Sequence, residues 1–496
     1  MTSAPPSPSS GTLSPVLLSA PAASDPAASG SAEPHVEGRH PAFAVAALCV
    51  GGLAVSLSQT MVVPIQGRLP ELLGSTASAT AWVVTVTLLA GAVAMPVAGR
   101  VADIVGKQRV VVACVVMLLV GCVVSALASS LAPMLVGRAL QGAAMGLVPV
   151  GIALMRQITP PRMAGSAIAT MSATLGVGGA IALPLSAWIV QVGSWHWLFW
   201  VSAALSLAVL LFVLVAVPHV HDPHAGARFD VPGAVGLSVG LVLLLVGISK
   251  GSSWGWSSTS TLGCLVGGVV VLAAWVALEL RVAQPLVDIR TTARPVVLLT
   301  NVAAIAVGFG LMAQMVAIPQ LLQLPTATGV GLGQTLLAAG LWMAPSGLTM
   351  MLCAPLSAAM IARFGPKPTL AIGSATIGIG YLVGRLLMAA SWELLIATIV
   401  IAAGVGIAYA AMPTLVLDAV PPAEAGSAVG VNALARALGT TSASAVIATI
   451  ITSDVDLTGA PTAEAFHASF LTGAVVALVG AAVALVIPVR RGRRRA

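Results

Sequence analysis

Charged residues are scarce in this sequence. Only 7% of its 496 residues are Asp, Glu, Lys or Arg, whereas a soluble domain carries roughly 25%. Hydrophobic residues make up 58% of the chain and aromatic residues only 4%. So few charges cannot cover the surface of a soluble protein, and most of the chain must lie in lipid. Long apolar runs without strict alternation exclude a membrane β-barrel and predict helices, which satisfy their own backbone hydrogen bonds.

Cysteine is also scarce, and its placement excludes several kinds of site. The five cysteines lie singly within apolar runs and form no CxxC pair. We therefore expect small buried side chains rather than disulfides or metal ligands. The sequence contains no HExxH motif, phosphate-binding loop or Ser/His/Asp cluster. An enzyme is not expected, and neither is a metal or another cofactor.

Acidic residues are missing from the middle of the apolar runs. All 15 fall in the tails, in loops or near the ends of runs. A buried carboxylate is the usual proton carrier and attracts lipophilic cations. The deep charges are instead Arg138 and Arg436, and arginine does not titrate near neutral pH. We therefore expect an anionic or neutral polar cargo; alternatively, both arginines bond to backbone carbonyls and helix C-termini. The uncharged polar candidates within the spans are Gln59, Asn301, Gln314 and Asn432.

Fourteen apolar runs reach about the 20 residues that a helix needs to cross a bilayer. If the N-terminus is cytoplasmic, most basic loop residues fall on the cytoplasmic side, and five tryptophans lie near outer helix ends. We therefore expect a multi-pass protein of the plasma (inner) membrane with both termini cytoplasmic, whose partner is the lipid bilayer and not nucleic acid. The runs lie at 42–63, 80–98, 110–129, 131–154, 166–190, 196–217, 232–249, 261–280, 297–322, 335–361, 368–389, 393–413, 426–450 and 468–488.

A short segment occurs twice, as PPRMAGSAIA from Pro160 and as PPAEAGSAVG from Pro421. The first copy joins spans four and five, and the second joins spans twelve and thirteen. This repeat predicts an all-α membrane protein with two six-helix halves, related by a pseudo-two-fold axis, and two inserted central helices. The predicted parts are a disordered cytoplasmic tail at 1–38, the halves at 42–217 and 297–489, the insert at 232–280, and a basic cytoplasmic tail at 490–496.

A charged loop with two glycines separates the second and third runs. Its pattern resembles the cytoplasmic loop between helices two and three of the major facilitator superfamily. The resemblance implies a gate in which Asp103 accepts hydrogen bonds from a neighbouring helix N-terminus or pairs with Arg109. The alternative is a basic loop that only sets topology. The expected gating residues are Gly99, Arg100, Asp103, Gly106, Lys107 and Arg109; a worn copy without the acid lies at Ala358, Ala362, Gly365 and Lys367.

Span four carries a second motif, in which Arg138 is followed by Gln141 and Gly142. It resembles the superfamily's Arg-x-x-Gln-Gly element. The resemblance implies that Arg138 faces the cavity and is linked to proton transfer. The alternative is that its side chain reaches the outer membrane interface, because Arg138 lies near the outer end of its span.

Span five carries Gly176, Gly179 and Pro184, which resemble the antiporter signature of the superfamily without its later glycines. These residues predict close helix packing and a kink. The fourteen spans resemble the drug:proton antiporter branch, although Ser58 stands where relatives in that branch carry an aspartate.

The resemblance implies a secondary transporter that exports small molecules, as drugs or metabolites, by proton antiport with alternating access. It implies a monomer driven by the proton gradient. Two alternatives stay open. One is a proton-coupled importer or facilitator of an anionic or polar metabolite, and the other is a membrane sensor that does not transport.

Overall fold

The computed structural model describes residues 41–218, 228–456 and 459–488. Within these ranges the chain is helical, and its only β-type pairing is an isolated bridge between Val455 and Pro461. The predicted tails at 1–38 and 490–496 lie outside the described residues.

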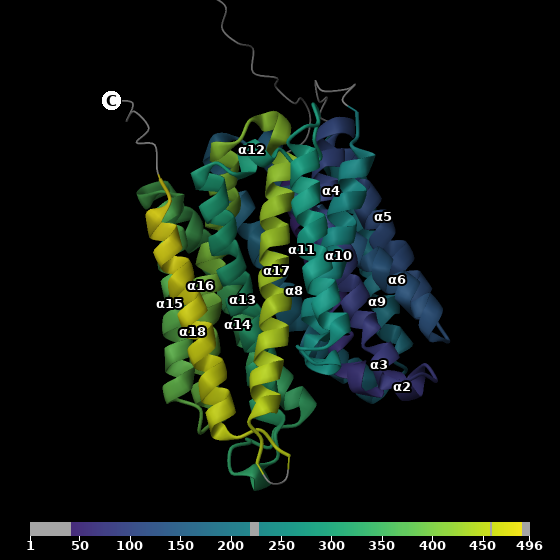
Figure 1. Ribbon diagram of the computed structural model, residues 1–496, viewed down its shortest axis with the longest axis vertical. Helices are drawn as coiled ribbons and strands as arrows, with labels where there is room; N and C mark the ends of the chain where they lie inside the picture. The colour runs from purple at the N-terminus through teal and green to yellow at the C-terminus, as the bar shows by residue number, and fades with distance from the viewer. Residues whose placement is uncertain (1–40, 219–227, 457–458, 489–496) are drawn as a thin grey trace, which may run out of the picture. The chain divides into compact units, whose positions relative to one another are not determined.

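The predicted number of spans is confirmed, because fourteen described helices are long and apolar enough to cross a membrane (Figure 1). The spans are α1 (Pro41–Thr60), α4 (Trp82–Val105), α5 (Lys107–Ala126), α6 with η2 and α7 (Leu131–Ala143, Ala144–Gly146 and Leu147–Ile158), α8 (Pro161–Val192), α9 (His196–Ala216), α10 (Val231–Trp254), α11 (Thr259–Glu279), α13 (Pro295–Gln323), α14 (Leu336–Phe364), α15 (Pro366–Leu386), α16 (Ser391–Ala419), α17 (Ala425–Ser453) and α18 (Ala463–Val486). The short elements are η1 (Val63–Arg68), α2 (Leu69–Leu72), α3 (Ala77–Thr80), α12 (Ile289–Thr292), η3 (Thr326–Thr328) and η4 (Pro422–Glu424).

The charged loop after the second span is much shorter than the sequence suggested. Helix α4 continues to Val105, and α5 already begins at Lys107. Only Gly106 interrupts the two helices, with a φ of +99° that favours glycine. The segment from Gly99 to Val105 therefore forms the last two turns of a helix. This arrangement aims the Asp103 side chain at a neighbouring helix rather than at solvent.

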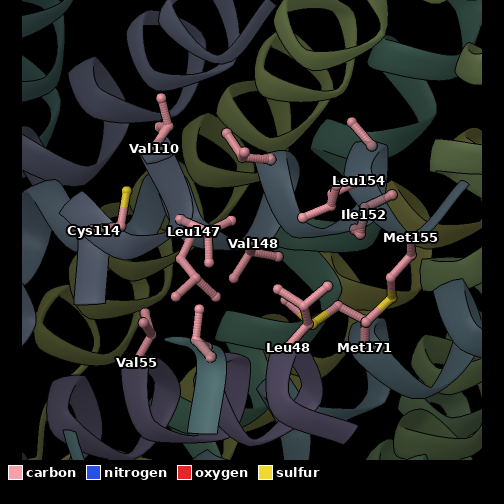
Figure 2. Close-up of a cluster of buried hydrophobic side chains, with 14 of the residues drawn as sticks. Leu48, Val55, Val110, Cys114, Leu147, Val148, Ile152, Leu154, Met155 and Met171 are labelled. Carbon is pink, nitrogen blue, oxygen red and sulfur yellow. The ribbon is translucent and has the colours of Figure 1, made fainter. Parts of the chain in front are cut away.

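Buried hydrophobic side chains form two large clusters. One is drawn mainly from α1, α5, α7, α8 and α9, and Figure 2 shows it around Leu48, Leu147 and Met171. The other is drawn from α13 to α18. Where two of these helices approach each other most closely, small residues at the contact set the distance between them. The exact limits of the two halves remain predictions.

Helices α10 and α11, which form the predicted insert, pack against each other (Figure 1). A Cβ on Gly268 of α11 would lie 2.7 Å from the backbone nitrogen of Leu244 in α10, so the glycine permits this close approach. Helix α10 also contacts α4 and α17. In contrast, α11 exposes Val266, Val269 and Val270, as a helix facing lipid would.

Candidate functional site

Asp103, the acid of the predicted gating motif, joins the end of α4 to the start of α17. The residue is only 3% exposed. Its Oδ1 accepts a hydrogen bond from the backbone N–H of Gly426 at 3.0 Å, and its Oδ2 accepts one from Ser427 at 2.9 Å. We call this contact the Asp103 latch, and the end of the helix bundle where it lies the latch side. The latch connects the two predicted halves of the chain.

The start of α17 suits an anion. Helix α17 begins at Ala425, so its first N–H groups have no acceptor within the helix, and the helix macrodipole favours negative charge there. The Nζ of Lys107 lies 3.5 Å from Asp103 Oδ1, and both side chains are 1% exposed. The two backbone bonds are charge-assisted and therefore stronger than neutral ones. Both oxygens of the ionised Asp103 carboxylate are thus occupied.

Two glycines make the latch possible. A Cβ on Gly99 would lie 2.3 Å from the carbonyl oxygen of Gly426, and a Cβ on Gly426 would lie 2.6 Å from the carbonyl oxygen of Gly99. Any larger residue at either position would push the two backbones apart. Close approach of α4 and α17 is therefore what brings Asp103 within hydrogen-bond distance of the α17 amides.

The other charged residues of the motif have different places. Arg109 is exposed and its Nη1 reaches the Val105 carbonyl at 3.5 Å, so the predicted pairing of Asp103 with Arg109 is wrong. Lys107 takes that place: it is the first residue of α5, directly after the turn at Gly106, and its Nζ lies beside the Asp103 carboxylate. Arg100 is half-buried, and its Nε has no hydrogen-bond partner.

A second connection joins the predicted halves on the latch side. Arg156, at the end of α7, lies 2.9 Å from Asp418, near the end of α16. The two side chains are 40% and 54% exposed. Exposed ion pairs contribute about 0–1 kcal/mol, so the buried Asp103 latch is the stronger of the two connections.

The repeat related to the latch has no acid. In the second copy of the motif, Ala362 takes the place of Asp103 and is exposed near the end of α14. In the first copy of the PPxxAGSA segment, Ser166 takes the place of Ser427 and is also exposed. Among the described side chains, no hydrogen bond or ion pair like that of Asp103 joins α8 to α14 at these positions.

Arg138 lies 1% exposed in α6, so its side chain does not reach the membrane interface. Its Nη1 donates to the carbonyl oxygen of Ser58 at 3.1 Å and its Nη2 to that of Gln59 at 3.5 Å. Its Nε donates to the carbonyl of Val83 at 3.4 Å. Helix α1 ends at Thr60, and the last carbonyl oxygens of a helix have no N–H donor within it. Arg138 thus caps the C-terminus of α1.

Gln141 extends this network. Its Oε1 accepts from Arg138 Nη1 at 2.5 Å and from Ser58 Oγ at 3.1 Å, and its Nε2 donates to Ser125 Oγ at 3.1 Å. Gly142 lets α4 approach, because a Cβ there would lie 2.3 Å from the Thr87 carbonyl oxygen. The predicted residues of span four therefore form one bonded cluster with α1, α4 and α5.

Arg436 belongs to a separate cluster in the second predicted half. Its Nη1 donates to Asn432 Oδ1 at 2.8 Å, and Asn432 Nδ2 donates to Asn301 Oδ1 at 2.9 Å. The guanidinium lies 5.2 Å from the centre of the Tyr409 ring. Its Nε and Nη2 form no hydrogen bond with the described residues and are not completely buried, although Arg436 as a whole is only 6% exposed. Unlike Arg138, Arg436 retains donors for a ligand.

The two glutamines predicted as cavity residues do not join these clusters through their side chains. Gln59 is half-buried and offers only its backbone carbonyl to Arg138. Gln314 is 1% exposed, and its Oε1 has no partner. It lies 13 positions beyond Asn301 in α13, or about 20 Å along the helix. Gln314 therefore lies apart from the Arg436 cluster, and its role as a cavity residue stays a prediction.

The glycine-rich part of α8 packs against α14, as small residues in a membrane helix predict. A Cβ on Gly176 would lie 2.0 Å from Met350 Sδ, whereas Gly179 has no neighbour closer than 3.7 Å. Pro184 lies inside α8. Beside it, α8 and α14 line a half-open cavity of about 260 Å³. The cavity is lined by Val177, Ala180, Ile181, Pro184, Leu185, Ala344 and Leu348.

Sequence reasoning placed Asp230 and Glu279 near the inner face and gave them no role. Both are buried, at 8% and 2% exposure. They flank the insert, one before α10 and one at the end of α11. Their separation in the sequence concealed that they face each other, and only an antiparallel pairing of the two insert helices would have revealed it.

Comparison with known proteins then decides the family. The sequence profile of the Major Facilitator Superfamily matches residues 48–324 and 300–496. The chain belongs to the Major Facilitator Superfamily. Proteins of this superfamily are transporters rather than enzymes. The chain is similar to an uncharacterized MFS-type transporter of Mycobacterium tuberculosis, with 32% identity over 306 residues, which are 61% of this chain and 44% of that protein.

This chain is also similar to the tetracenomycin C resistance and export protein of Streptomyces glaucescens. Identity is 27% over 328 residues, covering 66% of this chain and 60% of that protein. The chain thus spans about half the length of the curated relatives it matches. The crystal structure of the human organic anion transporter MFSD10 shares the fold, with a TM-score of 0.66, 14% identity, and coverage of 90% of this chain and all of that one.

Replacing Arg138 tests its capping role. We expect Arg138→Met to lower the thermal unfolding temperature of the purified protein. The substitution removes the side-chain donor to the Ser58 carbonyl and one of the two donors to Gln141 Oε1, and a buried acceptor left unpaired costs about 1–3 kcal/mol. Arg109→Met is the matched control, since Arg109 is exposed. Equal unfolding temperatures for both variants would show that Arg138 does not hold α1.

Proposed function

We propose that the protein is a secondary active transporter that exports small molecules by proton antiport, with alternating access. The observation that carries this proposal is the Asp103 latch, a buried contact between the predicted halves made of a few hydrogen bonds and two closely approaching glycines. Such a contact closes one side firmly and can still be broken. The name of the Streptomyces relative, an antibiotic resistance and export protein, supports export over import.

The latch gives alternating access a physical basis. Opening the latch side requires the two backbone hydrogen bonds of Asp103 to break, and a hydrogen bond to a charged group contributes about 1.5–3 kcal/mol. Their sum is of the size that the binding of a cargo or a proton can offset. Closing restores the bonds without any covalent step. The latch side is cytoplasmic under the positive-inside rule, so the state described is closed toward the cytoplasm.

The orientation and location follow from the same charges. Arg100, Lys107, Arg109 and Arg156 all lie near the latch side, and basic residues beside membrane spans favour the cytoplasm. We therefore place both termini in the cytoplasm and the protein in the plasma membrane, as a monomer driven by the proton gradient without a cofactor. Resistance to an antibiotic or export of a cell's own metabolite would be the physiological role.

The cargo class follows from Arg436. Its guanidinium lies against Tyr409 and is held by Asn432 through one nitrogen, while its other two nitrogens form no hydrogen bond with the described residues. A planar guanidinium binds carboxylate or phosphate groups in a forked geometry. Arg138, in contrast, uses its donors on backbone carbonyls. We therefore propose an anionic or neutral polar cargo, with Arg436 as the group that selects it.

Neutralising the latch tests the gate. We expect Asp103→Asn to leave membrane insertion unchanged and to lower transport, because asparagine loses the charge that strengthens both hydrogen bonds. Asp418→Asn is the matched control, since Asp418 forms only the exposed ion pair with Arg156, and we expect it to transport nearly as the wild type does. Transport is measured in cells at equal expression. If Asp103→Asn transports at the same rate as the wild type, the gating role is contradicted.

A flux assay tests the cargo class and the coupling together. Proteoliposomes with an imposed pH gradient are offered anionic, neutral and cationic compounds. We expect uptake of anionic or neutral compounds against their gradient, coupled to proton movement, and a several-fold greater loss for anions than for neutral compounds in Arg436→Gln. Arg109→Gln serves as the control. Transport of cations alone would refute the cargo proposal, transport without proton movement would refute antiport, and no transport of any compound would favour a sensor.

A further inference from the structure

Two carboxylates meet at the latch-side end of the two-helix insert. Asp230 directly precedes α10, and Glu279 is the last residue of α11. They are 8% and 2% exposed. Because α10 and α11 pack against each other, the start of one helix lies beside the end of the other. Two buried acids thus share one small space.

Gly233 shows how closely the carboxylates approach. A Cβ placed on Gly233 would lie 2.3 Å from Asp230 Oδ2 and 2.4 Å from Glu279 Oε1. The two oxygens therefore lie within a few ångströms of each other, and only glycine fits between them. Asp230 Oδ1 accepts the backbone N–H of Gly233 at 2.9 Å. Asp230 Oδ2 is buried without a hydrogen-bond partner. The backbone N–H groups of Leu286 and Val287 and the Trp275 indole lie close to the Glu279 carboxylate, but neither of its buried oxygens accepts a hydrogen bond of good geometry.

A third unpartnered group lies at the same place. Trp275 precedes Glu279 by one helical turn and is 9% exposed, and its indole Nε1 is buried without a partner. The indole N–H faces the Glu279 carboxylate but does not complete a hydrogen bond to it. Polar atoms inside a protein are rarely left unpaired. A proton bound between the two carboxylates would supply a hydrogen bond that these atoms lack.

No cation neutralises the pair within the described residues. Neither carboxylate forms an ion pair, and no cation is close enough to contribute to the electrostatics of Glu279, whose charged neighbour is Asp230. The charged side chains on the surrounding elements are exposed, half-buried or bound elsewhere. They are Arg228, Lys250, Arg281, Asp288, Arg290 and Arg294 around the insert, Arg100, Asp103 and Lys107 on α4 and α5, Glu424 before α17 and Arg436 within it.

Two ionised carboxylates cannot share a buried space without a counter-ion, so one of them must hold a proton. The helix ends indicate which one. Asp230 is the N-cap of α10, where the macrodipole favours a negative charge, whereas Glu279 lies at the C-terminus of α11, where it disfavours one. We propose that Asp230 and Glu279 form a proton-binding site in the insert, with the proton on Glu279 and donated toward Asp230 Oδ2.

The site lies beside the contact between the halves. Leu286 and Val287, which follow Glu279, are fully buried and belong to one hydrophobic cluster with Leu89 of α4 and Leu434 of α17. These two helices are the ones that the Asp103 latch joins. Loss of the proton would place two like charges next to this cluster and drive the insert helices apart. Proton binding to the insert therefore favours the packed state of the α4–α17 contact.

Infrared spectroscopy of the full-length protein in lipid tests the site without any transport assay, so the result does not depend on the proposed cargo or direction. We expect the wild type to show the C=O stretching band of a protonated carboxyl group at neutral pH, and Glu279→Gln to lose it. Asp230→Asn removes the like charge, so the band should titrate at a pH lower by at least about one unit. Asp288→Asn is the control, because Asp288 caps α12 with three hydrogen bonds, and should keep the band.

A labelling measurement covers the case in which a variant does not fold. Isotope labelling of the glutamate side-chain carboxyl carbon should shift the band in the wild type, whereas the same label in aspartate should not. A wild type without the band, a band that responds to the aspartate label alone, or a titration that Asp230→Asn leaves unchanged would overturn the proposal.

Discussion

The rest of the structure depends on one charged contact, in which the Asp103 carboxylate accepts the first backbone amides of α17. That contact requires a glycine on each helix, because Gly99 and Gly426 have room for no side chain. It also requires a single-residue break at Gly106, which places Lys107 beside the acid. These constraints explain why a membrane protein with so few charges retains an acid and a lysine in a buried position: together they hold the two predicted halves of the chain on one side.

Other buried charged residues in the chain also need partners within the protein, and they differ in whether they have them. In lipid each polar group must find its partner within the protein. Arg138 donates to backbone carbonyls at the end of α1 and the start of α4 through all three of its nitrogens, whereas two nitrogens of Arg436 form no hydrogen bond with the described residues. Asp230 and Glu279 have no cation beside them among the described residues, and three of their four oxygens accept no hydrogen bond of good geometry. Arg138, whose donors are bonded, holds helices together. Arg436 and the Asp230–Glu279 pair have donors or acceptors without partners, and these are the groups that we propose bind the cargo and a proton.

Sequence reasoning predicted the features that depend on composition and short spacing. The fourteen spans follow from hydrophobic length, and a helix N-terminus as the partner of Asp103 follows from the motif. Its second suggested partner, Arg109, was wrong because the single-residue turn at Gly106 places Lys107, the first residue of α5, beside the acid instead. The partners of Arg138 and the meeting of Asp230 with Glu279 could not be predicted. Both depend on where one helix ends beside another, and no local pattern records this.

The central claim is that the Asp103 latch opens and closes during transport, and distance measurement between spin labels tests it most directly. Labels at Val105→Cys and Pro422→Cys, both exposed positions on the latch side, report the separation of α4 from the start of α17. The account predicts a short distance in the wild type, a shift toward longer distances when Asp103→Asn is added, and a shift toward the short distance when Ala362→Asp supplies the related contact with an acid. A distance distribution that neither substitution changes would contradict the account.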